Sequence, residues 1–106
     1  MLFLAGIGPE DPTDGTPRHQ GDLYGECKYS WDKIKEFLGK HGAGLGDIVK
    51  STVYVTDMRY REEMRRCRAD VFPTGLVMPA QTLLGVASLA RPGMMIEIDI
   101  VAAVAK

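Results

Sequence analysis

The side chains with the clearest chemical potential are two carboxylates in an apolar segment near the C-terminus. Glu97 and Asp99 alternate with three isoleucines, so they share one face of an expected strand. Burial on that face, beside Met95 and Val101, raises the pKa of a carboxyl group toward the range of a general acid or base. Glu97 is therefore the candidate catalytic residue. An interface ion pair, with Lys50 as its partner, is the alternative.

The other reactive side chains are scattered along the chain. His19 lies in a loop and His41 at a helix end, and neither has further ligands at the spacing of a zinc site, so we expect no metal. Cys27 and Cys67 occupy apolar positions of two expected helices. We interpret them as separate buried thiols and not as a disulfide framework. This interpretation favours a cytoplasmic location, and a cysteine–histidine nucleophile stays open as an alternative.

Five arginines crowd one expected helix, where they alternate with acidic residues. They are Arg59, Arg61, Arg65, Arg66 and Arg68. Ion pairs between residues three or four apart on a solvated helix face are the simplest explanation. An anion-binding rim is the alternative. RNA contact is disfavoured, because interleaved aromatic side chains are scarce in this segment and the formal net charge of the chain is −1.

Apolar periodicity predicts an α+β scaffold for these residues. The helices are expected at residues 22–42 and 59–72, and the strands at residues 1–5, 48–57, 81–88 and 94–104. Asp22 should cap the first helix, and a long loop should span residues 6–21. The motif GAGLG at residues 42–46 follows a helix and precedes a strand, so it predicts a turn and not a phosphate-binding loop.

One face of the predicted sheet has no helix to cover it. Val49, Val53 and Val55 should face the two helices, while Tyr54, Met95 and Val101 lie on the opposite face among charged residues. A sheet face that mixes apolar and polar side chains is typical of a subunit interface, so we expect an oligomer.

Length and composition narrow the functional classes. The chain has 106 residues, with 13 basic and 14 acidic side chains and 45% hydrophobic residues, which predicts one globular domain over residues 1–106. Such a chain has a modest core and no room for a deep, fully enclosed site. No apolar run approaches the roughly 20 residues of a membrane span. Residues 1–5 lack the basic flank of a signal peptide and are expected to form a strand.

Three separated motifs resemble the reactive intermediate deaminase family, also called Rid or YjgF-like. They are GDIVKSTVYVTDM at residues 46–58, Pro79–Thr82, and IEIDIVA at residues 96–102, and FLAG at residues 3–6 resembles the Ser-Gly strand end of the family. The resemblance implies a chorismate-mutase-like α+β fold with two helices on one face of a mixed sheet. It also implies a homotrimer with a central barrel and ligand pockets between subunits.

The same resemblance implies a reaction and assigns residues to it. Members hydrolyse reactive enamines and imines to carbonyl compounds and ammonia without a cofactor, and others are described as ribonucleases or translation inhibitors. The family glutamate that holds the hydrolytic water corresponds to Glu97, and the arginine that clamps a substrate carboxylate corresponds to Gln81. A neutral amide anchors a small imino acid less firmly than a guanidinium does. Ala5 replaces the family serine beside Gly6, and Arg65 replaces an asparagine.

We therefore expect an enamine or imine deaminase with an altered substrate preference. Glu97 is the expected catalytic residue, and Gln81, Gly6, Ala5 and Arg65 are the expected substrate-binding residues. The expected partners are two further copies of the chain and a small imine or enamine, with no membrane, nucleic acid, metal or cofactor. The first strand of the family, which carries a site tyrosine, has no counterpart in residues 1–106. Two alternatives stay open: a non-catalytic binding trimer, and a ribonuclease or RNA-binding regulator.

Overall fold

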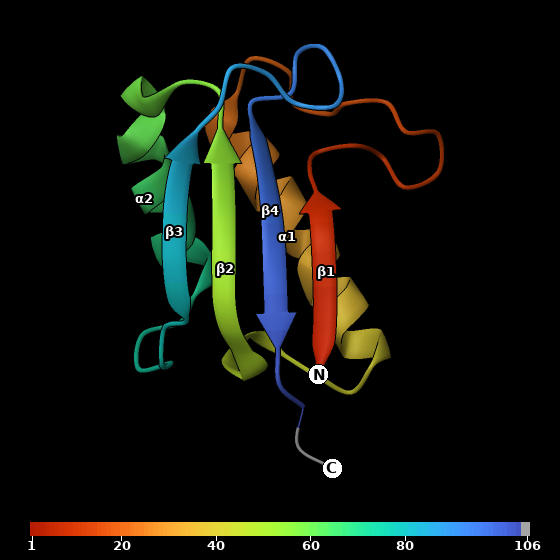
Figure 1. Ribbon diagram of the computed structural model, residues 1–106, viewed down its shortest axis with the longest axis vertical. Helices are drawn as coiled ribbons and strands as arrows, with labels where there is room; N and C mark the ends of the chain where they lie inside the picture. The colour runs from red at the N-terminus through yellow and green to blue at the C-terminus, as the bar shows by residue number, and fades with distance from the viewer. Residues whose placement is uncertain (105–106) are drawn as a thin grey trace.

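The computed structural model describes residues 1–104, in which a four-stranded sheet carries both long helices on the same side (Figure 1). The elements in chain order are β1 (Leu2–Ile7), α1 (Leu23–Lys40), β2 (Ile48–Val55), α2 (Arg61–Val71), β3 (Ala80–Gly85) and β4 (Ile96–Ala102), with short 3-10 helices at Leu45–Asp47 and Met58–Tyr60. The spatial order of the strands is β1-β4-β2-β3. Strand β4 is antiparallel to β1 and β2, while β2 and β3 are parallel and joined through α2. The predicted mixed sheet with two helices on one face is confirmed.

Helix α1 begins and ends where its sequence predicts. The side chain of Asp22 accepts a hydrogen bond from the backbone N–H of Gly25 at 3.0 Å, which satisfies one of the free donors of the first turn. Past the last turn, Gly42 takes a left-handed backbone with φ +74°. The predicted apolar stripe is buried at every position, which places α1 against the sheet: Leu23, Cys27, Trp31, Ile34 and Leu38.

The core lies between this sheet face and the helices. Ile96, Ile98 and Ile100 of β4 are at most 1% exposed and point toward the helices. Trp31 of α1 packs edge to face on Phe72 at the end of α2, with ring centroids 5.0 Å apart. Because β4 alternates strictly, Glu97 and Asp99 lie on the uncovered face, as the sequence predicts.

Most strand boundaries lie one to three residues from the predicted ones, and one side-chain orientation differs from the prediction. Strand β3 ends at Gly85, opposite Val55, where its partner β2 also ends. Strand β4 begins only at Ile96. The backbone N–H of Met95 donates to the side chain of Glu26 and not to a neighbouring strand. Strand β1 continues to residue 7 through a register shift. A second register shift, next to Ile48, turns Val49 outward, and its side chain is 48% exposed instead of facing the helices.

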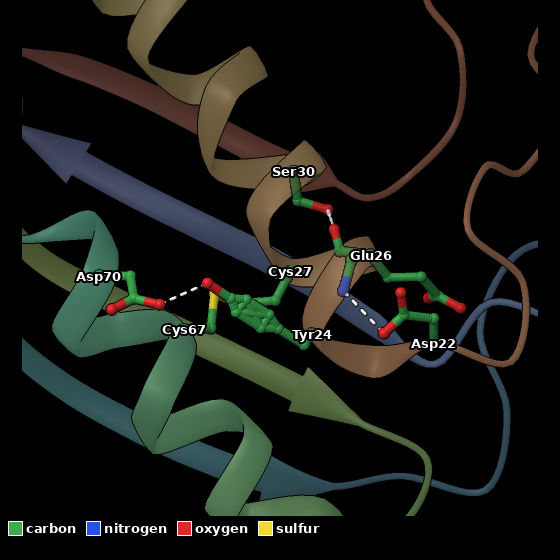
Figure 2. Close-up of a disulfide and its surroundings, with 8 residues drawn as sticks. Asp22, Tyr24, Glu26, Cys27, Ser30, Cys67 and Asp70 are labelled. Atoms are coloured by element: carbon green, nitrogen blue, oxygen red, sulfur yellow. Dashed lines mark hydrogen bonds between the residues drawn. A yellow bond between two sulfur atoms is a disulfide. The ribbon is translucent and has the colours of Figure 1, made fainter.

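The interpretation of Cys27 and Cys67 as separate thiols is wrong. Their sulfur atoms form a disulfide that joins α1 to α2, with the Cα atoms 6.4 Å apart (Figure 2). Each cysteine occupies the buried stripe of its own helix, and only the packing of α1 on α2 brings the two stripes together. Disulfides persist mainly in oxidising environments, so the two cysteines do not support the expected cytoplasmic location. No helix within residues 1–104 has the length and apolar character to cross a membrane.

Candidate functional site

The structure divides the five predicted site residues between the two sides of the sheet. Glu97 projects from the uncovered face of β4, and Ala5 and Gly6 belong to the neighbouring edge strand β1. Gln81 and Arg65 lie on the helix side, where both line a cavity between α2 and the strands β2 and β3. Within a single chain, Gln81 therefore lies near Arg65, and Glu97 lies near Gly6. The sheet separates the first pair from the second.

Asp99 organises the polar part of the uncovered face. Its Oδ1 accepts a hydrogen bond from the backbone N–H of Gly6 at 2.8 Å, and its Oδ2 accepts one from the hydroxyl of Tyr54 at 2.9 Å. Gly6 has φ +68° within the register shift of β1, a conformation that side chains other than glycine rarely adopt. Both oxygens of Asp99 are thus engaged within the fold, which makes this carboxylate a brace between β1, β4 and β2.

Glu97 differs from Asp99 because its carboxylate has no hydrogen-bond or ion-pair partner in the described part of the chain. It is half-buried, directly opposite Tyr54 of β2. Burial raises the pKa of Glu97, and the negative charges of Asp99 and Glu10 raise it further. Lys50 lies opposite Val101, further along the strand, and forms no ion pair with Glu97 within this chain. A half-buried carboxylate of raised pKa is suited to accept a proton from water.

A second carboxylate, Glu26, was missed by the sequence reasoning. It projects from the first turns of α1 (Figure 2) and is fully buried. Its Oε1 accepts a hydrogen bond from the N–H of Met95 at 2.8 Å. Burial raises the pKa of Glu26 to about 7. This contact fixes the start of β4, two residues before Glu97. The chemical type of a residue inside an amphipathic helix gives no signal for such a role.

The cavity on the helix side has a volume of about 590 Å³. Its inner wall is apolar and its rim, from the start of α2, is cationic. The lining residues are Cys27, Trp31, Val53, Met58, Arg59, Arg61, Glu62, Met64, Arg65, Arg68, Gln81 and Leu83. The side-chain oxygen of Gln81 is buried there without a hydrogen-bond partner among residues 1–104. An orphaned buried acceptor is rare in folded proteins and marks a place where a donor group belongs.

The arginines around the cavity are not equivalent. Arg59 forms hydrogen bonds of 2.7–3.1 Å with Asp57, and Arg65 pairs with Glu62 one turn earlier. The predicted ion pairs of this helix are thus confirmed for Arg65. Arg68, in contrast, is half-buried and forms no ion pair within residues 1–104, and its Nε is a buried donor without a partner. Its position three residues after Arg65 is the only signal in the sequence that links it to the same rim.

Comparison with known proteins assigns the chain to a family. The endoribonuclease L-PSP family profile matches residues 1–104. The chain belongs to the endoribonuclease L-PSP family, which includes the Rid and YjgF-like proteins. A RutC family protein of Pyrococcus horikoshii is 34% identical over 102 residues, which are 96% of this chain and 78% of that protein. The resemblance to the Rid family predicted from the three motifs is therefore confirmed.

One more distant relative has a named activity, and two solved structures share the fold. A 2-iminobutanoate/2-iminopropanoate deaminase of Salmonella typhimurium is 28% identical over 103 residues, covering 96% of this chain and 78% of that enzyme. The structure of YyfA, a Rid protein of unknown function from Yersinia pestis, superimposes with a TM-score of 0.88 at 26% identity and covers 97% of this chain and 79% of that one. Yeast Mmf1 gives a TM-score of 0.82 at 29% identity, covering 94% and 76%.

Proposed function

We propose that the chain is an enamine or imine deaminase that hydrolyses a C=N bond to a carbonyl compound and ammonia. The observation that carries the proposal is Glu97, a half-buried carboxylate without a partner within residues 1–104, whose pKa is raised by burial. In its ionised form, Glu97 accepts a proton from a water molecule while the water oxygen attacks the carbon of the C=N bond. The imine nitrogen takes this proton back from Glu97, which completes a neutral carbinolamine. Transfer of the carbinolamine hydroxyl proton to the same nitrogen, again through Glu97, then expels ammonia and leaves the carbonyl compound. No electrons are gained or lost overall.

Two parts of the fold support Glu97 in this role. The Asp99 brace holds β1, β2 and β4 together on both sides of Glu97, and Glu26 anchors the residue that precedes β4. These contacts limit the movement of the Glu97 backbone, and a positioned base is more effective than a mobile one. The adjacent backbone of Ala5 and Gly6 is the proposed further contact for the substrate, which its pairing with β4 and its bond to Asp99 support.

We also propose that the protein works as a homotrimer. The uncovered sheet face carries apolar side chains such as Phe3, which is 73% exposed, and Leu84, which is 43% exposed. Glu97 and Gln81 project from opposite sides of one sheet, so a site that contains both requires a second copy. The resemblance to the Rid family implies ligand pockets in the clefts between subunits, which supports this proposal. Analytical ultracentrifugation tests this directly, with a mass three times that of the chain expected and a monomer as the contrary result.

The deaminase proposal is tested by ammonia release from imines generated in the assay. Two substrates are compared: the imine of pyruvate and an imine with a larger apolar side chain. Acceleration over the buffer reaction is expected, and it should be greater for the larger substrate because Gln81 offers no charge to a small carboxylate. Absence of acceleration with both substrates would contradict the proposal.

A non-catalytic binding trimer is the second candidate, and the neutral Gln81 is the observation that favours it. In that case keto acids would raise the melting temperature of the protein while no imine would be hydrolysed. The RNA-related alternative gains less support, because ion pairs with Asp57 and Glu62 neutralise Arg59 and Arg65. RNA binding that weakens with salt would be needed to revive it.

A further inference from the structure

The cavity between α2 and the sheet contains two buried polar atoms whose hydrogen-bonding capacity is unused. One is the donor Nε of Arg68, and the other is the acceptor Oε1 of Gln81. The two side chains line the same cavity from opposite walls, Arg68 from α2 and Gln81 from β3, and they do not bond to each other. A ligand that accepts from one and donates to the other would satisfy both.

Arg68 is the cavity arginine best prepared to bind an anion. Arg59 and Arg65 are exposed and each has an acidic partner, and Arg61 is exposed to solvent at the start of α2. Arg68 is half-buried, and within residues 1–104 no carboxylate lies within ion-pair distance. A guanidinium without a counter-ion beside an apolar wall offers two parallel donors to a carboxylate, in a setting where water competes less for them.

The disulfide holds Arg68 in this place. Cys67 precedes it in the chain, and the bond to Cys27 ties this turn of α2 to α1. Cys27 itself lines the cavity. The disulfide therefore restrains the backbone from which Arg68 projects, so binding a ligand does not require this turn of α2 to become ordered.

We propose that Arg68 donates to the carboxylate of the substrate, and that the Oε1 of Gln81 accepts a hydrogen bond from the N–H of the imine or enamine. This inference rests on the proposed deaminase function, because it names the substrate class of that site. The class is an imine or enamine that bears a carboxylate and an apolar body. The body packs on Met58 and Leu83, the more accessible apolar side chains of the lining. The cavity of about 590 Å³ is in the range that accommodates ligands larger than a three-carbon acid.

Binding of phenylpyruvate, a stable keto acid with an aromatic body, tests the inference by isothermal titration calorimetry. The Arg68→Gln variant should raise the Kd by about tenfold or more, the loss typical for one charge-assisted hydrogen bond. Ethyl phenylpyruvate, which lacks the negative charge, should bind weakly and equally to wild type and Arg68→Gln. Arg66→Gln is the matched control. Arg66 is on the same helix but stacks on Tyr24, with its Cζ 4.2 Å from the ring centroid, and it does not line the cavity.

An Arg68→Lys variant shows whether a loss in Arg68→Gln reflects charge or folding. It should recover part of the affinity if the cavity binds a carboxylate, and the urea midpoints of all variants should agree. Equal affinity of Arg68→Gln and wild type for phenylpyruvate would overturn the inference, as would an equal loss in Arg66→Gln or no binding to wild type.

The outcome for Arg68 is separable from the outcome for the deaminase. Ammonia release that proceeds normally in Arg68→Gln while phenylpyruvate binding is unchanged would reject the inference and leave the deaminase in place. Binding of phenylpyruvate that depends on Arg68, in a protein that hydrolyses no imine, would support the anion site and reject the deaminase.

Discussion

Reduction of the Cys27–Cys67 disulfide should remove a large part of the stability of the fold. The bond closes a loop between residues 40 positions apart. In the chain-entropy treatment, a loop of this length restricts the unfolded state by about 4 kcal/mol at 25 °C. A domain of this size unfolds with a free energy of about 5–15 kcal/mol, so the reduced protein should be folded but much less stable.

Urea unfolding with and without dithiothreitol measures the effect. Trp31 is the single tryptophan of the chain, is 2% exposed, and lies one turn after Cys27 in α1, so its fluorescence reports on the packing of both helices. With an unfolding slope of about 2 kcal/mol per molar urea, the midpoint should fall by about 2 M on reduction. The Cys27→Ala/Cys67→Ala double variant is the control and should not respond to dithiothreitol.

Two results would refute this reasoning. Free thiols in the non-reduced protein, detected by mass spectrometry after alkylation, would show that the bond does not form. An intact bond whose reduction leaves the urea midpoint unchanged would show that the packing of α1 on α2 restricts the chain without it. If the disulfide also positions Arg68, reduction should weaken phenylpyruvate binding under conditions in which the protein is still folded.

Three further substitutions test other parts of the structure. The pKa of Glu26 is raised from 4.5 to about 7, so the native state binds more protons than the unfolded state between these values, and stability should fall by about 3 kcal/mol as the pH rises through that window. Glu26→Gln retains an acceptor for Met95 and should flatten this dependence in urea titrations at several pH values. Gly6→Ala should cost about 1–2 kcal/mol from its left-handed backbone alone, since no atom lies within 4 Å of the added Cβ. Gly21→Ala, with φ +83° and equally open space, should match Gly6→Ala in stability, and only Gly6→Ala should also slow ammonia release. Gln81→Arg should lower the Kd for pyruvate by about tenfold, because a charged donor replaces a neutral one, and an unchanged Kd in calorimetry would count against a carboxylate beside residue 81.

The sequence predicted the fold well where local pattern decides the structure. The spacing of apolar residues located α1, and the alternation in β4 placed Glu97 and Asp99 on the uncovered face, because both patterns follow directly from helix and strand geometry. Val49 was misplaced because a register shift interrupts the alternation, and nothing in the local sequence announces it.

The site was predicted less completely because its contacts join segments far apart in the chain. The bond from Gly6 to Asp99 spans 93 residues, and the bond from Met95 to Glu26 spans 69. Periodicity gives no information on such pairs, and the same is true of the disulfide. Arg65 was singled out ahead of Arg68, because only the packed structure shows that Glu62 pairs with Arg65 while the Nε of Arg68 is a buried donor without a partner in residues 1–104.

The central claim is that Glu97 acts as the base in imine hydrolysis, and the rate of ammonia release by Glu97→Gln tests it most directly. Glutamine preserves the size of the side chain but cannot accept the proton, so the rate should fall by about a hundredfold or more. Glu36→Gln is the control, since Glu36 is exposed on α1 and pairs with Lys40. The wild-type rate should also fall as the pH drops through the raised pKa of Glu97, where the base becomes protonated. Ammonia release by Glu97→Gln at the wild-type rate would contradict the account.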